Sequence, residues 1–251
     1  MKSAKGLDVE LPVMEIVRDA SWSLMSNRQV LLSRFLPVML VLGCIDWAAS
    51  QFLPKDDLRQ IFPFVISIAI SILFATAAHR LTLRSSRLLA ERLWQKSETR
   101  YLLYGFYIGI VMALTACLAI LLAVVVLGQQ GLMVGAVLGL MLALYVTARL
   151  SIVLPEIALG GTGTLKRAWD LSNGNGSRLV LVVWILPILS SSPFLLMYFG
   201  DHMFMRLLAA FGIYVMTLFS LVTLSLSYRF LADYADSDEQ THDDPANGLD
   251  A

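Results

Sequence analysis

The chain has 251 residues, of which 57% are hydrophobic and only 15% are charged, and its formal net charge is zero. Ordinary soluble domains contain about 45–50% apolar and about 25% charged residues. The composition therefore excludes a typical soluble globular protein and predicts an all-α membrane protein.

The first 28 residues carry mixed charges and lack the short apolar core of a secretory signal. Within them, apolar residues recur at helical spacing, at Val13, Ile16, Val17, Ala20 and Leu24. This pattern predicts a cytoplasmic amphipathic helix. Two placements fit it equally: flat at the membrane interface, or packed against the inner end of a helix bundle.

Residues 29–232 contain the apolar runs of a membrane domain. A transmembrane helix needs about 20 mostly apolar residues. The longest uncharged run, 101–148, has 48 residues, too many for one helix and enough for two. A Gly-Gln-Gln-Gly turn at 128–131 divides it, so the sequence predicts a tight helical hairpin. Single spans are predicted at 35–53, 60–78, 179–200 and 207–228, which makes a polytopic bundle of six transmembrane helices.

Basic residues favour six spans with both termini in the cytoplasm. With this count, 16 of the 19 Lys and Arg residues lie inside and three outside, as expected for short cytoplasmic loops. Omitting the first span, which Pro37 and Asp46 interrupt, would place eight of them outside. Seven acidic residues lie in 233–251, which we expect to be a disordered cytoplasmic tail. The predicted location is the bacterial inner membrane.

A basic cluster follows the second span, at His79, Arg80, Arg84 and Arg87. Positions 80, 84 and 87 share one helical face. Such a stripe can hold anionic lipid headgroups, with about 1 kcal/mol for each basic residue near the surface. The charge asymmetry of membrane topology alone also produces it. Membrane lipids, anionic ones among them, are therefore candidate partners.

Ionisable residues inside membrane spans are candidates for polar sites. Asp46 lies within the first span, either at the outer headgroup boundary beside Trp47 or in a polar cavity. Arg149 and Glu156 lie seven residues apart across a bend at Pro155, and can share one helical face. They predict an ion pair, an arginine that reaches lipid phosphates, or a substrate site.

Two features concern helix packing. Glycines recur every four residues in the hairpin, at Gly105 and Gly109 and again at Gly131, Gly135 and Gly139. Such spacing lets helix backbones approach closely, within the chain or in an oligomer. The fifth span holds two prolines separated by serines (187–193), which predicts either an ordinary kink or the broken helix of a transporter site.

Short motifs link the chain to a known family. His79 and Arg80 close the second span, and Arg149 is followed six residues later by Pro155. The stretch LKRAWDLS follows at 165–172, and SYRFL closes the last span at 227–231. From about residue 60 to 232 the chain thereby resembles the YciC-type proteins, an uncharacterised bacterial membrane family, and the membrane domain of some glycerophosphoryl diester phosphodiesterases. The soluble segments are too short for a phosphodiesterase domain, so the resemblance does not imply that activity.

The loop before the fifth span also predicts a structure of its own. Leu165, Ala168 and Trp169 can form one face of a short interfacial helix that begins near Thr162 or Thr164 and ends at Gly174.

Three functions remain open. The first is a non-enzymatic membrane protein that organises or interacts with lipids or other membrane proteins, alone or as a homo-oligomer. The second is a small transporter or permease subunit with a polar site near Asp46 and the Arg149–Glu156 bend. The third is an enzyme acting on lipid headgroups, which is disfavoured because we find no nucleotide-binding loop, nucleophile motif or paired histidines. We expect no cofactor, no metal site and no nucleic-acid partner.

Overall fold

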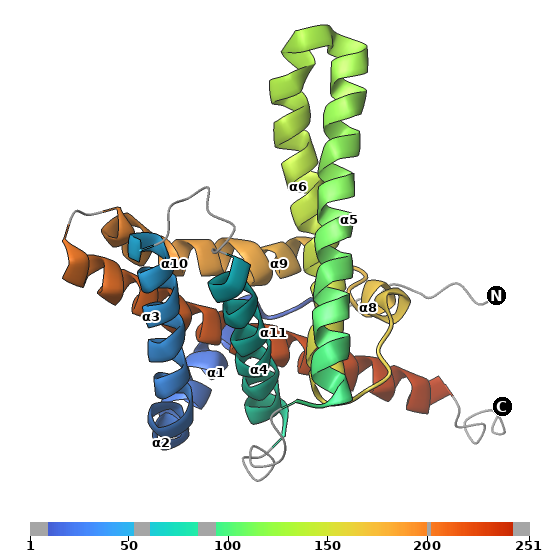
Figure 1. The fold of residues 1–251 in the computed structure, drawn as a ribbon. Coiled ribbons are helices and arrows are strands. Elements are labelled where there is room, and N and C mark those ends of the chain that lie inside the picture. Colours follow the sequence, from blue (N-terminus) through green and yellow to red (C-terminus); the bar gives the residue numbers. More distant parts are fainter. Residues whose placement is uncertain (1–9, 53–60, 85–93, 200–201, 243–251) are drawn as a thin grey trace, which may run out of the picture.

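The computed structural model describes residues 10–52, 61–84, 94–199 and 202–242, and within these ranges it contains helices and no strand (Figure 1). The helices are α1 (Val13–Ser26), α2 (Arg28–Val30), α3 (Leu36–Phe52), α4 (Ile61–Leu83), α5 (Lys96–Leu127), α6 (Gly131–Ser151), α7 (Val153–Ala158), α8 (Leu165–Leu171), α9 (Gly176–Val180), α10 (Leu186–Tyr198) and α11 (Met203–His242). The all-α prediction is confirmed.

Five helical stretches among the described residues are long and apolar enough to cross a membrane. They are Arg28–Ala49, Ile61–Leu83, Lys96–Ala158, Gly176–Tyr198 and Met203–Ala235. The third is 63 residues long and comprises α5, α6 and α7. The chain is therefore an integral membrane protein, and the count of six crossings stays a prediction.

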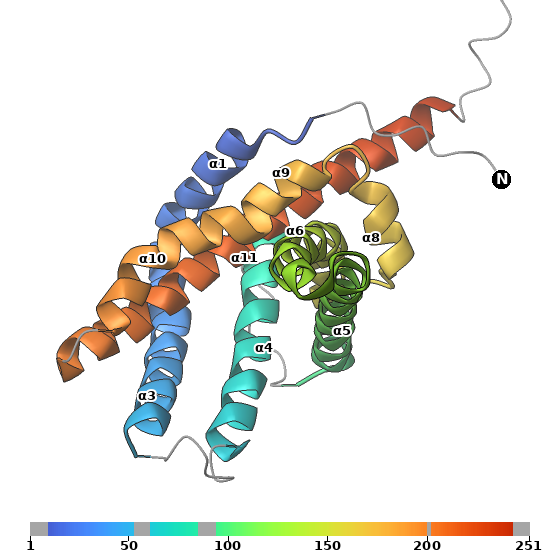
Figure 2. The same cartoon turned by 90° about the horizontal axis from the view of Figure 1, so that it is seen from above.

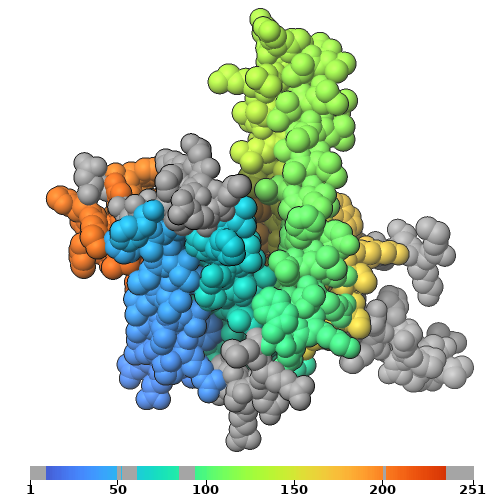
Figure 3. All heavy atoms as spheres, viewed as in Figure 1, coloured from blue at the N-terminus to red at the C-terminus, as the bar shows by residue number. Residues whose placement is uncertain are grey.

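Helices α5 and α6 form the predicted hairpin, joined by a short 3₁₀ turn at Gly128–Gln130. Gly128 has a φ of 64°, which residues with a Cβ rarely adopt. The outer part of the hairpin stands clear of the other helices (Figures 1 and 3). Its apolar side chains are open to the surroundings, with Val126 77% and Met133 82% exposed. Helices that are apolar on every side suit lipid rather than water.

Small residues set the close approach of α6 to α5. Gly131, Gly135 and Gly139 all lie against the backbone or alanine side chains of α5. A Cβ at Gly135 would lie 2.8 Å from the Ile120 Cα atom, which is too close for a real contact. The glycine spacing of α6 therefore serves packing within the hairpin.

We expect Gly135→Ala to lower the free energy of unfolding by about 1–3 kcal/mol, because the methyl group overpacks this contact. Gly105 on α5 is the matched control, since nothing lies within 4 Å of its Cβ position. Gly105→Ala should raise stability by about 0.5–1 kcal/mol through helix propensity. Unfolding of both variants in one detergent measures the difference, and effects of the same sign would contradict the packing.

Two of the membrane helices contain a π-helical segment just before a proline. Leu31–Phe35 precedes Pro37, and Leu181–Ile185 precedes Pro187. A proline lacks a backbone donor and its ring crowds the carbonyl four residues earlier. A π-helical turn absorbs this irregularity without ending the helix. The first span is therefore continuous despite Pro37 and begins earlier than predicted, at Arg28.

The serines of α10 bond to the backbone around the second proline of that helix. Pro193 cannot donate to the Leu189 carbonyl, and the Ser192 hydroxyl donates to that carbonyl instead at 2.8 Å. Ser190 donates in the same way to the Pro187 carbonyl at 3.1 Å. These local bonds favour the ordinary kink over a broken helix that awaits a ligand.

Helix α11 runs for 40 residues and extends well beyond the predicted last span. No proline or glycine interrupts it after Gly212, and Arg229 pairs with Asp233 one turn later at 3.6 Å. The prediction of a disordered tail from residue 233 is therefore wrong for 233–242, which continue the helix. Residues 243–251 lie outside the described part of the chain.

The helices are not all parallel. α10 and α11 lie side by side and cross the α5–α6 hairpin steeply in both views (Figures 1 and 2). Their contact is close at Gly212, where a Cβ would overlap the Phe194 ring. α11 also contacts α1, α3 and α4, so it is the helix around which the molecule is assembled.

The predicted amphipathic helix is α1, and it packs against α11. Ile16 and Ala20 are buried there, at 5% and 0% exposure. The helix thus packs on the bundle, as the second predicted placement requires, and its location at the cytoplasmic end stays a prediction. Trp22 and Met25 remain exposed on its other side, where they can contact lipid.

Candidate functional site

The ionisable residues singled out in the sequence fall into three separate places. His79 and Arg80 lie where α4 meets α5 and α11, Arg149 and Glu156 hold the helix α8, and Asp46 lines a cavity between α3, α4, α5 and α11. The sequence suggested one polar site near Asp46 and the Arg149–Glu156 bend. In the structure, Asp46 lies apart from Arg149 and Glu156.

His79 is fully buried and joins three helices. Its Nδ1 lies 2.7 Å from the Ser225 hydroxyl oxygen and its Nε2 lies 3.1 Å from the Tyr101 hydroxyl. The Ser225 hydroxyl already donates to the Leu221 carbonyl at 2.8 Å, so it accepts from Nδ1–H. In a neutral ring with its proton on Nδ1, Nε2 then accepts from the Tyr101 hydroxyl. Both ring nitrogens are thus used internally, and His79 cannot bind a lipid headgroup as predicted.

Arg80 is bound to the protein in the same region. Its Nη2 atom lies 2.6 Å from the Glu98 carboxylate, and its Nε donates to the Ala158 carbonyl at 2.8 Å. Nη2 also donates to the Ser97 hydroxyl at 2.8 Å. A guanidinium held at three points is a structural group, so Arg80 is not a free headgroup ligand.

Glu98 is a buried charge that the sequence reading missed. Its side chain is 1% exposed, and it accepts from the backbone N–H of Gln95 at 2.8 Å. This bond forms one half of a capping box at the start of α5. The spacing of Gln95 and Glu98 before an apolar run was the available signal, but it indicates only the cap and not the partner on α4.

The other members of the predicted basic stripe differ from these two. Arg84 is exposed at the end of α4, and Arg87 lies outside the described residues. A headgroup-binding role for Arg84 and Arg87 stays a prediction.

Arg149 is buried, at 6% exposure, and binds the C-terminal end of α8. Its Nη2 donates to the Trp169 carbonyl at 2.6 Å and its Nε to the Ser172 hydroxyl at 2.9 Å. The guanidinium carbon also lies 3.7 Å from the centre of the Trp169 ring, within the range of a cation–π contact. Arg149 therefore fixes the short helix onto α6.

Glu156 binds the other end of α8. Its carboxylate lies 3.3 Å from Arg167, and the loop at Gly161 and Gly163 is so close that a Cβ at either would press on the Glu156 side chain. The predicted pair between Arg149 and Glu156 is therefore wrong: each binds a different end of α8. The helix itself is where it was predicted, with Thr164 as its N-cap, accepting from the Arg167 N–H at 3.2 Å.

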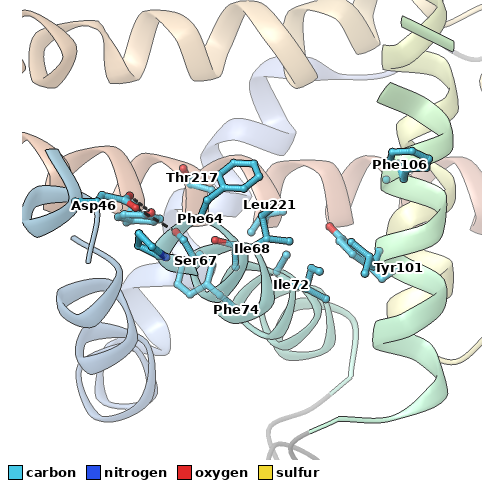
Figure 4. A pocket seen from close by; sticks show the side chains of 17 residues that line it. Asp46, Phe64, Ser67, Ile68, Ile72, Phe74, Tyr101, Phe106, Thr217 and Leu221 are labelled. Carbon is cyan, nitrogen blue, oxygen red and sulfur yellow. Dashed lines mark hydrogen bonds between the residues drawn. The ribbon is translucent and has the colours of Figure 1, made fainter. Parts of the chain in front are cut away.

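An opening of about 840 Å³ lies between α3, α4, α5 and α11 (Figure 4). Its walls are mostly apolar, and they include five aromatic side chains, at Phe64, Phe74, Tyr101, Phe106 and Tyr214. The α4 wall extends from Pro63 to Ala75, which is about 18 Å at 1.5 Å per residue. None of the described lysines and arginines lines this cavity.

Asp46 lies at one end of the cavity, opposite Tyr101 (Figure 4). Ser67 on α4 donates to Oδ1 at 3.1 Å, and the Tyr214 hydroxyl on α11 donates to Oδ2. Polar groups from three helices thus meet at one point of an apolar wall. Asp46 thus lines a cavity, and its position relative to the outer headgroup boundary stays a prediction.

Gly105 and Gly109 open space rather than close it. Neither has an atom within 4 Å of its Cβ position. Gly105 lines both the large cavity and a second one of about 340 Å³, and Gly109 lines the second alone. The two cavities share Tyr101, Thr217 and Leu221 as well, so they adjoin at Gly105.

Metal-ligating side chains are not clustered in the described ranges. No group of three or more His, Cys, Asp or Glu side chains is placed there to hold a metal ion. The third hypothesis required an inner pocket with at least two carboxylates, and the cavity walls described above contain one, at Asp46. What this arrangement can do is accept an elongated apolar group with a polar end.

The fold and this cavity define the class: an all-α integral membrane protein with an apolar cavity between its helices. Comparison with protein-family models, with curated proteins and with solved structures finds no match. The resemblance to YciC-type proteins therefore stays a prediction.

Proposed function

We propose that this chain is a non-enzymatic inner-membrane protein that binds a lipid, with one acyl chain in the cavity between α3, α4, α5 and α11. The observation that carries this proposal is the shape and lining of the cavity. It is apolar along about 18 Å of α4, close to the roughly 15 Å half-thickness of a bilayer's hydrocarbon core. A lipid from one leaflet matches that length.

The chemistry of the walls supports binding rather than catalysis. Apolar pockets with a few placed polar groups are typical of ligand sites. The polar atoms of the His79 region and of the α8 region are held in internal bonds, which leaves them no evident role in a reaction.

The orientation belongs to the same proposal. The excess of basic residues on one side, 16 against three, supports an inner-membrane location with both termini in the cytoplasm. The exposed hairpin surface is available to bulk lipid, to a second copy or to another membrane protein, which agrees with a role in organising the membrane.

The test uses Gly105, where both cavities adjoin. Gly105→Leu should fill that junction without a clash at its Cβ, and should reduce co-purified lipid at least about tenfold as measured by native mass spectrometry of the full chain. Gly109→Leu is the matched control, because it faces only the smaller cavity, and it should retain the lipid. Equal retention by Gly105→Leu and the unmodified chain would contradict the proposal.

A small transporter is the second candidate, favoured by the position of Asp46 in a cavity. The structure removes part of its basis, because Arg149 and Glu156 lie at α8 instead. Transport requires water to reach the cavity from both sides of the membrane. Single cysteines at Ser67 and Ser71, in a background without Cys44 and Cys117, should react with a water-soluble thiol reagent from both sides if the chain transports, and from at most one side if it holds lipid.

A further inference from the structure

We infer that the Asp46 end of the cavity recognises a lipid headgroup that carries a primary ammonium. This inference rests on the proposed lipid binding and deepens it by naming the class of lipid. It stands on three observations: the geometry of the carboxylate, the charges around it, and the donors already committed to it.

The carboxylate is held in place by two different helices. Ser67 donates to one oxygen and Tyr214 to the other. An ionised carboxylate has about four acceptor positions, so roughly half of them remain for a ligand. Because both fixed partners are donors, the group that completes the site must donate as well.

No described residue supplies a positive charge to Asp46. Arg80 and Arg149 are bound elsewhere, and the part of the cavity wall that the structure describes contains no lysine or arginine. A carboxylate in apolar surroundings is costly unless a cation pairs with it. A ligand ammonium would provide that cation at the end of an apolar chain.

The same geometry discriminates among headgroups. An anionic headgroup would be repelled by Asp46, and the Ser67 and Tyr214 hydroxyl protons are already donated to the carboxylate. A quaternary ammonium has the charge but no N–H to donate. The expected order of binding is therefore phosphatidylethanolamine, then phosphatidylcholine, then phosphatidylglycerol, which reverses the preference that the basic cluster of the sequence suggested.

The experiment offers the full chain, stripped of lipid in detergent, these three lipids with identical acyl chains, and measures retention by native mass spectrometry. The unmodified chain should retain phosphatidylethanolamine about tenfold or more over phosphatidylglycerol, since hydrogen bonds between charged groups are stronger than those between neutral groups. Asp46→Asn keeps the side-chain size and should remove the preference. Asp233→Asn makes the same chemical change at an exposed carboxylate outside the cavity, and it should preserve the preference.

The outcomes separate this inference from the lipid-binding proposal. If all three lipids bind the unmodified chain equally, or if Asp46→Asn leaves their order unchanged, the headgroup inference is overturned while lipid binding stands. If no lipid is retained and Gly105→Leu changes nothing, lipid binding itself fails. A preference for phosphatidylglycerol would also overturn the inference.

Discussion

Glu98→Ala should lower the free energy of unfolding by about 3–5 kcal/mol, because it leaves the Arg80 guanidinium in a largely buried position without its counter-charge. Only 1% of the Glu98 side chain and 19% of the Arg80 side chain are exposed. The variant also removes one half of the capping box of α5, since the Glu98 side chain accepts from the Gln95 N–H. Denaturant unfolding in detergent, followed by far-ultraviolet circular dichroism, measures the loss.

An exposed ion pair in the same chain is the control. Arg229 and Asp233 pair at 3.6 Å with side chains 62% and 72% exposed, so Asp233→Asn should change stability by less than about 1 kcal/mol. The double variant Arg80→Met with Glu98→Ala should cost less than the sum of the single variants, because the two groups share one interaction. Additive losses of stability would show that Arg80 and Glu98 are not coupled. If Arg80→Met is stable but retains less lipid, the headgroup role first predicted for Arg80 would be restored.

The parts of the fold that follow from local composition were predictable. The 48 uncharged residues with a glycine-rich centre allow little other than a hairpin, and the apolar periodicity of α1 fixes a helix. The extent of α11 was not predictable from hydropathy, because residues 233–242 are polar and yet contain nothing that ends a helix. Polarity marks where lipid ends, whereas only a proline, a glycine or a cap marks where a helix ends.

The cavity could not be predicted, and the glycines show why. The same four-residue spacing occurs in α5 and in α6, yet Gly135 lies against a backbone and Gly105 faces open space. The difference depends on which helix lies opposite, and that is a property of the whole arrangement. The partners of Asp46 also depend on the whole arrangement, because Ser67 is 21 residues away in the sequence and Tyr214 is 168 residues away.

The region around α8 illustrates a partly correct prediction. Spacing indicated that Arg149 and Glu156 belong to one bend, and both do contact the segment that follows it. Their separate partners could not be read from spacing, since α8 folds back so that Trp169 meets Arg149 while Arg167 meets Glu156. A short helix held at both ends is thus the structural role of two residues that resembled a site.

Arg149→Lys should lower the free energy of unfolding by about 2 kcal/mol and Arg149→Ala by about 3 kcal/mol, although the first keeps the charge. A lysine ammonium cannot stack flat on the Trp169 ring while it donates to both the Trp169 carbonyl and Ser172. Each buried acceptor that loses its partner adds a further cost. The loss should concentrate at α8, so limited proteolysis of the loop at 159–175 should accelerate before the rest of the chain unfolds.

Lys166→Ala is the matched control for this prediction, because Lys166 is an exposed cation on the same short helix, and it should leave both stability and proteolysis unchanged. Trp169→Leu separates the two parts of the Arg149 contact, since it removes the ring and keeps the carbonyl. If Trp169→Leu loses less stability than Arg149→Ala, the hydrogen bonds of Arg149 contribute more than its contact with the ring. If Arg149→Lys is as stable as the unmodified chain, a positive charge alone is enough to hold α8, which would contradict this prediction. In that case Arg149 would become a candidate to bind lipid phosphates, and the headgroup experiment should be repeated with Arg149→Lys in place of Asp46→Asn.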